Sequence, residues 1–253
     1  MIDTHCHVHD KQFDVDRDAV VARALDAGVT AMVTIGEDIE DSRRAIALAE
    51  PYEISVAAGI HPHEAKNAPP EIAAELRPLL DAPGVIAIGE TGLDYYYDHS
   101  PRDRQADVLR AQIRLAREVG LPVVFHHRDA FSDFCAILHE EWAVGMRGVV
   151  HCFTGSAAEA RTFIGEFDLY LGIGGVLTFP NAAGLREAVV GVGPGRLVLE
   201  TDSPYLAPVP VRGKRNEPSF VAHTAAKLAE LLAMPLDDLV LATDENAKTL
   251  FEL

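Results

Sequence analysis

The chain opens with the stretch Met-Ile-Asp-Thr-His-Cys-His-Val, residues 1–8, a short apolar run that ends in two histidines. In a β-strand, residues two apart point to the same face, so His5 and His7 project together while Cys6 points away. Two imidazoles placed in this way can reach one divalent metal ion, because neutral imidazole nitrogen is a common metal ligand. The alternative for this tripeptide alone is a pair of solvated histidines at a strand end.

Similar apolar runs recur along the chain, and longer amphipathic stretches separate them. Runs that are apolar on successive residues are typical of parallel strands buried on both faces. The predicted strands are residues 1–7, 29–36, 54–60, 85–90, 121–127, 148–153, 169–174 and 196–201. The 3.6-residue periodicity predicts helices over residues 16–27, 39–50, 102–119, 156–167, about 218–233 and 237–251. Ser156 and Glu159 are spaced as a capping box.

Eight strands that alternate with helices predict an α/β fold, a (β/α)8 TIM-type barrel, with an open doubly wound sheet as the alternative. The strand count favours the barrel, and so does the gathering of polar residues at the C-terminal ends of the strands. No internal repeat, low-complexity tract or linker-like segment divides the 253 residues. We therefore expect a single domain over residues 1–253, a common size for such barrels.

The composition restricts the classes of function. A net charge of −17 argues against a broad basic surface for nucleic acid. Three cysteines, an odd number without a Cys-x-x-Cys motif, indicate no disulfide framework and a reducing compartment. No room for a signal peptide precedes His5, and no apolar run is long enough to cross a bilayer. We therefore expect a cytoplasmic protein without membrane contact or a stable protein partner.

Most of the eleven histidines fall at or just past the C-terminal end of a predicted strand. They are His5, His7, His9, His61, His63, His126, His127 and His151. In a barrel these strand ends form the mouth where catalytic groups collect. The other three, His99, His139 and His223, fall in a loop or on helices, and we expect them at the surface.

Acidic residues follow the same pattern. Glu90 ends the fourth predicted strand, and Glu200 and Asp202 lie at the end of the eighth. A charged side chain at the end of a buried strand is costly unless it is paired or metal-bound. The alternatives are a salt bridge at the barrel end for Glu90 and a turn residue before Pro204 for Asp202.

Together the strand ends offer four imidazoles and two carboxylates. These candidate metal ligands are His5, His7, Glu90, His126, His151 and Asp202. The set exceeds the needs of one four-coordinate ion and suits two ions that share a carboxylate. Nitrogen and oxygen ligands without thiolate suit magnesium, manganese or zinc, so we expect two divalent ions of one of these metals.

A set of motifs resembles the TatD-like metal-dependent hydrolases of the amidohydrolase superfamily. These motifs are Asp-Thr-His-Cys-His (3–7), Gly-Ile-His-Pro-His (59–63), Ile-Gly-Glu-Thr-Gly-Leu-Asp-Tyr (88–95), His-His-Arg (126–128), His-Cys-Phe-Thr-Gly (151–155), Glu-Thr-Asp-Ser-Pro-Tyr-Leu-Ala-Pro (200–208) and Arg-Gly-Lys-Arg-Asn-Glu-Pro (212–218). The resemblance runs from residue 3 to the end of the chain. It implies a distorted barrel and a metal-dependent deoxyribonuclease, often a 3′–5′ exonuclease.

The resemblance also implies how the ligands are shared. One metal ion would be held by His5, His7, Glu90 and Asp202, and the second by Glu90, His126 and His151. The chain departs from the family at His9, because the family usually has an acid soon after the His-x-His pair and Asp10 is shifted by one position. This leaves open whether His9 replaces that acid.

Two candidate catalytic residues follow from this reading. A bound divalent ion lowers the pKa of water, and Asp202 would hold or deprotonate that water. His63, just past the third predicted strand, is placed to touch the substrate or protonate a leaving group. The alternative for His63 is a loop histidine hydrogen-bonded to the backbone.

The predicted substrate contacts point to a phosphodiester at the end of single-stranded DNA. Arg128 follows two histidines, and its planar guanidinium suits phosphate oxygens. The long loop over residues 203–218 carries a basic cluster: Arg212, Lys214, Arg215 and Asn216. Tyr95 and Phe153 offer aromatic faces on which a base could stack. The alternative for the basic cluster is a solvated loop paired with surface acids.

Two other functions are compatible with the same residues. One is a small-molecule amidohydrolase or esterase on the same two metals, which would not require the basic cluster. The other is a non-catalytic metal-containing interaction protein, against which the complete ligand set and Asp202 count.

Overall fold

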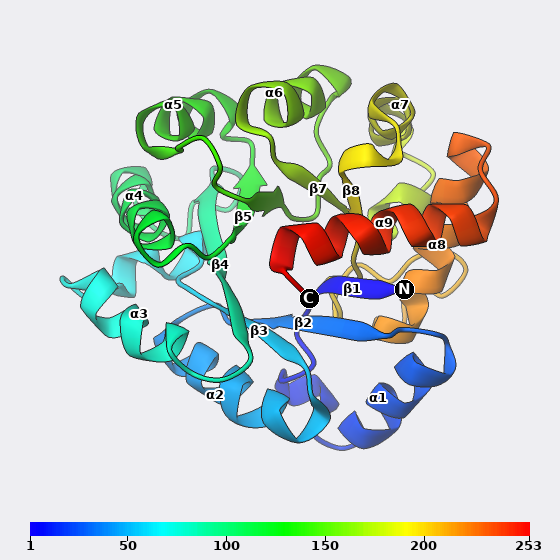
Figure 1. Ribbon diagram of the computed structural model, residues 1–253, viewed down its shortest axis with the longest axis horizontal. Coiled ribbons are helices and arrows are strands. Elements are labelled where there is room, and N and C mark those ends of the chain that lie inside the picture. The colour runs from blue at the N-terminus through cyan, green and yellow to red at the C-terminus, as the bar shows by residue number, and fades with distance from the viewer. The chain divides into compact units, whose positions relative to one another are not determined.

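The computed structural model describes residues 1–253, with eight strands in one sheet and nine α-helices (Figure 1). The strands are β1 Ile2–Cys6, β2 Ala31–Ile35, β3 Ser55–Ala58, β4 Val85–Asp94, β5 Val123–Arg128, β6 Gly148–Val150, β7 Tyr170–Ile173 and β8 Leu197–Leu199. The helices are α1 Arg17–Asp26, α2 Ile39–Ala49, α3 Ile72–Leu80, α4 Arg102–Val119, α5 Phe131–Glu141, α6 Ala157–Phe167, α7 Ala183–Val192, α8 Val221–Leu232 and α9 Leu236–Phe251.

The strand order confirms the (β/α)8 fold class. The strands follow one another in the sheet in chain order from β1 to β8, and the pairs β1–β2, β3–β4, β4–β5, β5–β6 and β7–β8 are parallel. A doubly wound sheet reverses its strand order part-way, because its chain starts in the middle of the sheet. The open doubly wound alternative is therefore excluded. All eight predicted strands are present, with ends that differ by a few residues.

The chain divides into two compact units, residues 1–34 with 152–253, and residues 35–151. In the first unit, α9 packs on β8 and β1, and the buried side chains include Val198, Leu239 and Leu250 (Figure 1). Just past β8, Ser203 forms a parallel bridge with Cys6 at the end of β1. The loop after β8 is thereby fixed to the end of β1. The expectation of a single domain stays a prediction.

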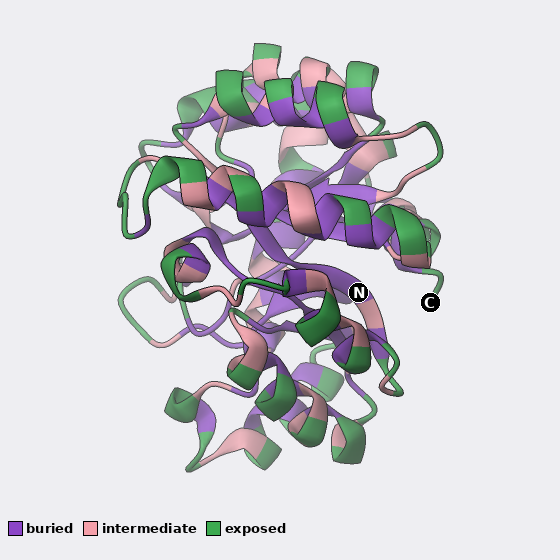
Figure 2. Cartoon of the chain, turned by 90° about the vertical axis from the view of Figure 1, so that its left-hand side faces the viewer, coloured by how far each residue is buried: buried purple, intermediate pink, exposed green.

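The second unit places α2, α3, α4 and α5 against β3, β4 and β5. Phe125 of β5 packs edge-on against Phe134 of α5, with 5.3 Å between ring centroids. Leu109 and Ile113 bury the inner side of α4. Figure 2 shows the same pattern in the helices generally, with one buried stripe and one exposed stripe along each. Burial of these apolar stripes is the main contribution that holds the helices on the strands.

Strand β4 runs four residues further than predicted, to Asp94, because Gly92 lets it approach β5. A Cβ atom on Gly92 would lie 1.8 Å from the carbonyl oxygen of His126, so only glycine fits there. Past Glu90, the register continues from Thr91 opposite Phe125 to Asp94 opposite Arg128. The extension carries an additional acidic side chain to the end of the strand.

All six predicted helices are present, but the structure contains three further helices that the sequence analysis did not predict. The capping box at Ser156 and Glu159 is present, and α6 begins at the next residue after Ser156. Helix α8 begins at Val221, after a short 3-10 turn over Pro218–Phe220. Helices α3, α5 and α7 were not individually predicted, and α3 contains Pro78, which weakens a helical pattern.

The structure also describes the state of the cysteines and the character of the helices. All three cysteines are free thiols, with Cys6 buried and the other two half-buried. None of the helices combines the length and the apolarity that a membrane-spanning segment needs.

Candidate metal centre

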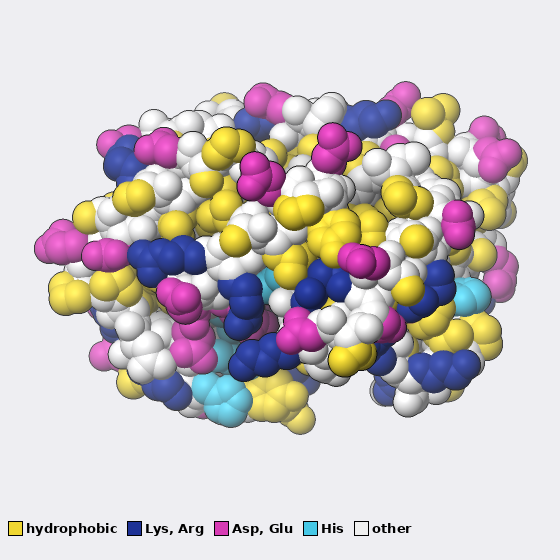
Figure 3. Space-filling view, turned by 90° about the horizontal axis from the view of Figure 1, so that it is seen from below, with side chains coloured by type: hydrophobic (Ala, Val, Ile, Leu, Met, Phe, Trp, Pro, Cys, Tyr) yellow, Lys and Arg dark blue, Asp and Glu magenta, His cyan; other side chains and the backbone are white.

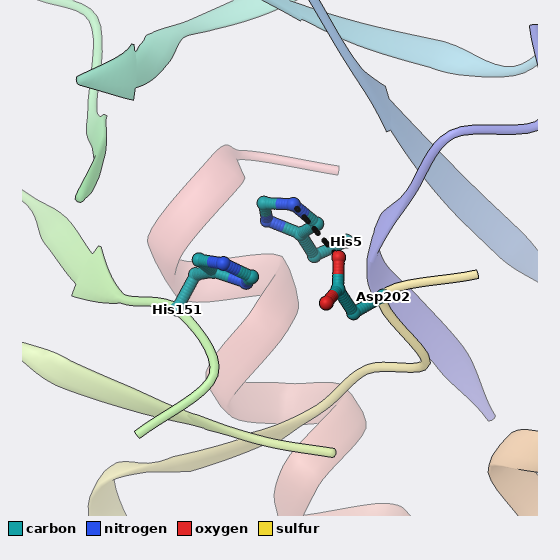
Figure 4. A group of neighbouring side chains, drawn as sticks. All are labelled: His5, His151 and Asp202. Carbon is teal, nitrogen blue, oxygen red and sulfur yellow. Dashed lines mark ion pairs between the residues drawn. The ribbon is translucent and has the colours of Figure 1, made fainter. Parts of the chain in front are cut away.

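The first unit brings His5, His7 and Asp202 together. His5 lies in β1, His7 follows its end, and Asp202 lies three residues past β8. The Nε2 atoms of His7 and His5 lie 3.5 and 3.9 Å from Asp202 Oδ1 (Figure 4 draws His5 with Asp202). Two backbone bonds hold this arrangement: Asp202 N donates to His5 O at 2.9 Å and His7 N donates to Ser203 O at 2.7 Å. The prediction that the ends of the first and eighth strands meet is confirmed.

Asp3 supports the loop that carries Asp202, and the sequence analysis gave it no role. Its buried carboxylate accepts hydrogen bonds from Thr201 N at 2.9 Å and Thr201 Oγ1 at 2.6 Å. Burial raises the pKa of Asp3 to about 8, although these bonds oppose the shift. An acidic residue within a buried strand was the signal that could have identified it.

The second unit gathers three imidazoles around one carboxylate oxygen, Glu90 Oε1. His126 Nδ1 lies 2.9 Å from this oxygen, His151 Nε2 lies at 3.2 Å and His61 Nε2 at 3.5 Å. Glu90 is 3% exposed, and His61 and His151 are buried with it. Of this group, His61 was placed at the strand ends by sequence but was not assigned as a ligand.

Asp94 at the end of β4 lies next to this cluster, and it is the second acid that the sequence analysis left without a role. Its Oδ2 lies 2.9 Å from His126 Nε2 and 3.0 Å from His63 Nε2. Burial alone would raise the pKa of Asp94, but hydrogen bonds from His126, His63 and the Tyr97 backbone lower it below its usual range. The predicted strand ended at Glu90, so the sequence pattern gave no signal that Asp94 belongs to the same strand.

The histidines of this cluster have different pKa values because their partners differ. Burial lowers the pKa of His61 to about 4, so its imidazole is neutral at neutral pH. Burial also disfavours the charged form of His126, but hydrogen bonds to Asp94 and Glu90 outweigh it and raise the pKa. In His63, burial lowers the pKa despite the Asp94 contact.

The donor atoms of both clusters are spaced as ligands of one ion are spaced. Two atoms that each lie about 2.1 Å from a tetrahedral ion are roughly 3.4 Å apart. In the second unit, His151 and His61 lie 3.2 and 3.5 Å from Glu90 Oε1. In the first unit, the separation of His7 from Asp202 is 3.5 Å. Buried nitrogen and oxygen donors at these distances fit a divalent metal ion.

His9 and Asp10 are fixed by protein contacts close to the first strand. His9 is buried, and its Nδ1 lies 2.8 Å from Thr34 Oγ1. The Asp10 carboxylate accepts from Gln12 N at 2.7 Å and so caps the 3-10 turn over Lys11–Phe13. His127, in the second unit, packs its ring 5.2 Å from that of Phe134.

The predicted substrate contacts in the second unit lie around the end of β5. The guanidinium of Arg128 stacks 4.0 Å from the ring of Tyr96 and 4.9 Å from that of Tyr97. Tyr95 has its hydroxyl bonded to Asp133 at 2.7 Å and its ring covered by Arg102 at 4.0 Å. Tyr96 and Tyr97 are more exposed than Tyr95, with 59% and 50% of their surface open, although Arg128 lies against both rings.

Two of the four side chains in the basic cluster after β8, those of Arg215 and Asn216, are held by contacts within the protein. Arg215 makes a two-point ion pair with Asp16 at 2.7 and 2.9 Å, and it stacks on Phe13. Asn216 is buried and donates to the backbone oxygens of Thr201 and Tyr205, which braces the loop. The alternative of a loop paired with surface acids describes the contact of Arg215 but not that of Asn216, which is buried and bonds to backbone oxygens.

The other two side chains of the cluster, those of Arg212 and Lys214, take no part in the contacts of Arg215 and Asn216. The Arg212 guanidinium stacks 3.6 Å from the Phe179 ring, and Lys214 is exposed. Phe153 was wrongly offered as a stacking face, because it is buried and packs on Phe163. On the face drawn in Figure 3, acidic side chains are interspersed with lysines and arginines.

The comparison with known families identifies the family of the chain. A family model described as TatD related DNase matches residues 2–252. The chain belongs to the TatD-related DNase family. The family match and the relatives below make this TatD-family protein a metal-dependent hydrolase, as the resemblance of its motifs implied.

Relatives and solved structures agree with this assignment. The uncharacterized metal-dependent hydrolase YabD of Bacillus subtilis strain 168 is 44% identical over 254 residues, which are 100% of this chain and 99% of that protein. The 3'-5' ssDNA/RNA exonuclease TatD of Cronobacter turicensis is 40% identical over 258 residues, 99% and 97% of the two chains. The crystal structure of YJJV, a TatD homolog from Escherichia coli K12, superposes with a TM-score of 0.94 at 32% identity over 100% and 98% of the chains. The TatD fold therefore covers the whole chain.

Proposed function

We propose that this TatD-family hydrolase removes nucleotides from the 3′ end of single-stranded nucleic acid, with single-stranded DNA as the preferred substrate. The observation that carries the proposal is the group of imidazoles around one buried carboxylate oxygen of Glu90. A relative that is 40% identical is named a 3'-5' ssDNA/RNA exonuclease, which supports the same substrate class. The free cysteines support a cytoplasmic location.

The proposed ligand arrangement follows the family motifs. His5, His7, Glu90 and Asp202 hold one divalent ion, and Glu90, His126 and His151 hold a second, the ions being magnesium, manganese or zinc. In a (β/α)8 fold the C-terminal ends of all eight strands form one face, and each proposed ligand lies at or near such an end. The buried His61 lies with its Nε2 3.5 Å from Glu90 Oε1, and its low pKa keeps its imidazole neutral beside the second ligand group.

The chain supplies the groups that position and protonate the substrate. When bound, the ions act as Lewis acids that lower the pKa of water and offset charge on phosphate oxygens. Asp202 takes the proton of the attacking water, and its backbone bond to His5 keeps its carboxylate in place. His63, half-buried and bonded to Asp94 through Nε2, contacts the substrate and, when its ring is also protonated at Nδ1, gives that proton to the leaving oxygen.

The same residues suggest where the strand end binds. Arg128 contributes a planar cation for a phosphate, and Lys214 and Arg212 extend positive charge along the loop after β8. Tyr95 is a weaker base contact than Tyr96 and Tyr97 because its side chain is less exposed. Arg215 and Asn216 act by holding the loop in shape, since acids and backbone groups already engage them. Binding of this kind is weak, salt-dependent and indifferent to sequence.

The direct test is a nuclease assay on 3′-labelled single-stranded DNA with magnesium or manganese, with and without EDTA. We expect stepwise shortening that EDTA abolishes. No shortening, or shortening that survives EDTA, would refute the nuclease proposal. Lys214→Ala separates it from an amidohydrolase on the same metals: the phosphodiesterase loses substrate affinity, whereas hydrolysis of a neutral amide or ester is unaffected.

A further inference from the structure

Asp94 occupies a buried position between the Glu90 cluster and His63. It ends β4, opposite Arg128 of β5, and Arg128 is two residues beyond His126. Because side chains alternate along a strand, Asp94 and His126 project from the same face. The carboxylate is fully buried, so its contacts with neighbouring groups are not diluted by water.

The orientation of this carboxylate is fixed from several sides. Its Oδ1 accepts hydrogen bonds from Tyr96 N at 3.0 Å and Tyr97 N at 2.8 Å. The side chain of buried Gln105 bonds to both backbone groups of Asp94, accepting from its N at 2.8 Å and donating to its O at 3.2 Å. These bonds use one carboxylate oxygen and the backbone, and they leave Oδ2 aimed at the histidines.

Both histidines present the same ring nitrogen to that oxygen. His126 Nε2 lies 2.9 Å and His63 Nε2 lies 3.0 Å from Asp94 Oδ2. An ionised carboxylate only accepts hydrogen bonds, so each ring carries its proton on Nε2. His126 Nδ1, the atom that a metal ion would take, lies 2.9 Å from Glu90 Oε1 and donates to it while no ion is bound.

We propose that Asp94 is a positioning residue that sets the tautomer and the orientation of His126 and His63 together. The proposal rests on the proposed function, because it takes His126 as a metal ligand and His63 as a proton donor to the substrate. A carboxylate behind a ligating histidine orients the ring and raises its basicity, and its loss typically weakens metal binding about 10- to 100-fold. The same oxygen connects the two roles, so one substitution affects both.

The test is Asp94→Asn, which keeps the shape of the side chain and removes its charge. At pH 8, nitrogen NMR of the imidazoles should show His63 in the metal-free wild type and His126 in the zinc-loaded wild type as Nε2–H tautomers, and both as mixtures in the variant. Titration calorimetry with Mn²⁺ should show binding weakened about 10- to 100-fold at one site. With DNA as substrate, kcat should fall with little change in KM.

Asp98→Asn is the matched control, since it removes a carboxylate four residues away that pairs with Arg102 and touches neither histidine. It should leave tautomers, Mn²⁺ affinity and kcat unchanged. Unchanged tautomers and affinity in Asp94→Asn would overturn the proposal. So would an Nδ1–H tautomer of His63 in the metal-free wild type, a result that does not depend on how the variant folds. If the wild type binds no metal or leaves DNA intact, the proposed function fails, and the tautomer measurement still decides the role of Asp94.

Discussion

At the scale of single residues, the sequence predicted which histidines and acids gather at the strand ends, but not the protein contacts of the loop after β8. Histidines and acids at strand ends can be found by position alone, because burial makes an unpaired charge costly there. Arg215 and Asn216 share the composition of a binding loop, yet their partners are Asp16 and nearby backbone oxygens. Those partners depend on tertiary packing, which loop composition does not encode.

The exposed aromatic pair beside Arg128 gives a prediction at this scale. Tyr97→Ala should weaken the binding of single-stranded DNA by about 5- to 150-fold, because stacking of one base contributes roughly 1–3 kcal/mol. Fluorescence anisotropy of metal-free protein with a labelled oligonucleotide measures this without turnover. An abasic oligonucleotide of equal charge should lose much less affinity.

Tyr95→Phe is the companion variant for this experiment. It removes only the hydroxyl that bonds to Asp133, and the ring stays beneath Arg102. Its DNA affinity should match the wild type. Equal affinities for Tyr97→Ala and the wild type would show that the tyrosines beside Arg128 do not contact bases.

At the scale of elements, the apolar runs in the sequence predicted where the strands lie, but not how far each strand extends. Apolar runs located all eight strands, because strands buried on both faces carry few polar residues. The pattern ended β4 at Glu90, whereas the strand continues to Asp94 through a close approach at Gly92. A contact between two backbones leaves no hydrophobic pattern, so Asp94 was missed as a member of the site.

Gly92→Ala tests that contact. The added methyl group meets the carbonyl of His126, so β4 and β5 must separate, and overpacking of this kind typically costs about 1–3 kcal/mol or more. Urea denaturation should show a lower free energy of unfolding, and metal binding should weaken because His126 moves.

Gly165→Ala supplies the comparison for this strand variant. Gly165 lies within α6, and a Cβ atom there has no neighbour within 4 Å. Alanine in a helix interior is favoured over glycine by about 0.5–1 kcal/mol, so this variant should be more stable than the wild type. A Gly92→Ala protein as stable as the wild type would contradict the proposed backbone contact.

At the scale of the whole molecule, an acidic chain depends on its arginines for stability near neutral pH. Arg114 donates hydrogen bonds to the Glu141 carboxylate and holds its pKa below the ordinary value of 4.5. A lowered pKa stabilises the folded state above 4.5, and this stabilisation is lost as the pH falls through the folded value. The wild type should therefore exceed Glu141→Gln in unfolding free energy at pH 7, and the difference should shrink toward pH 3.

Glu75→Gln is the control for the pH series, since Glu75 is exposed on α3. Its difference from the wild type should be small at every pH. A Glu141→Gln difference that stays constant between pH 7 and pH 3 would show that the Arg114 contact does not contribute to stability through charge.

The central claim is that buried histidines and acids at the strand ends hold two divalent ions through a shared Glu90. The most direct measurement is the metal content of reconstituted, dialysed protein by elemental analysis, for the wild type and Glu90→Gln. The account predicts two ions per chain in the wild type and a loss of both from Glu90→Gln, with circular dichroism unchanged. A wild type that retains no stoichiometric metal, or a Glu90→Gln protein that keeps both ions, would contradict it.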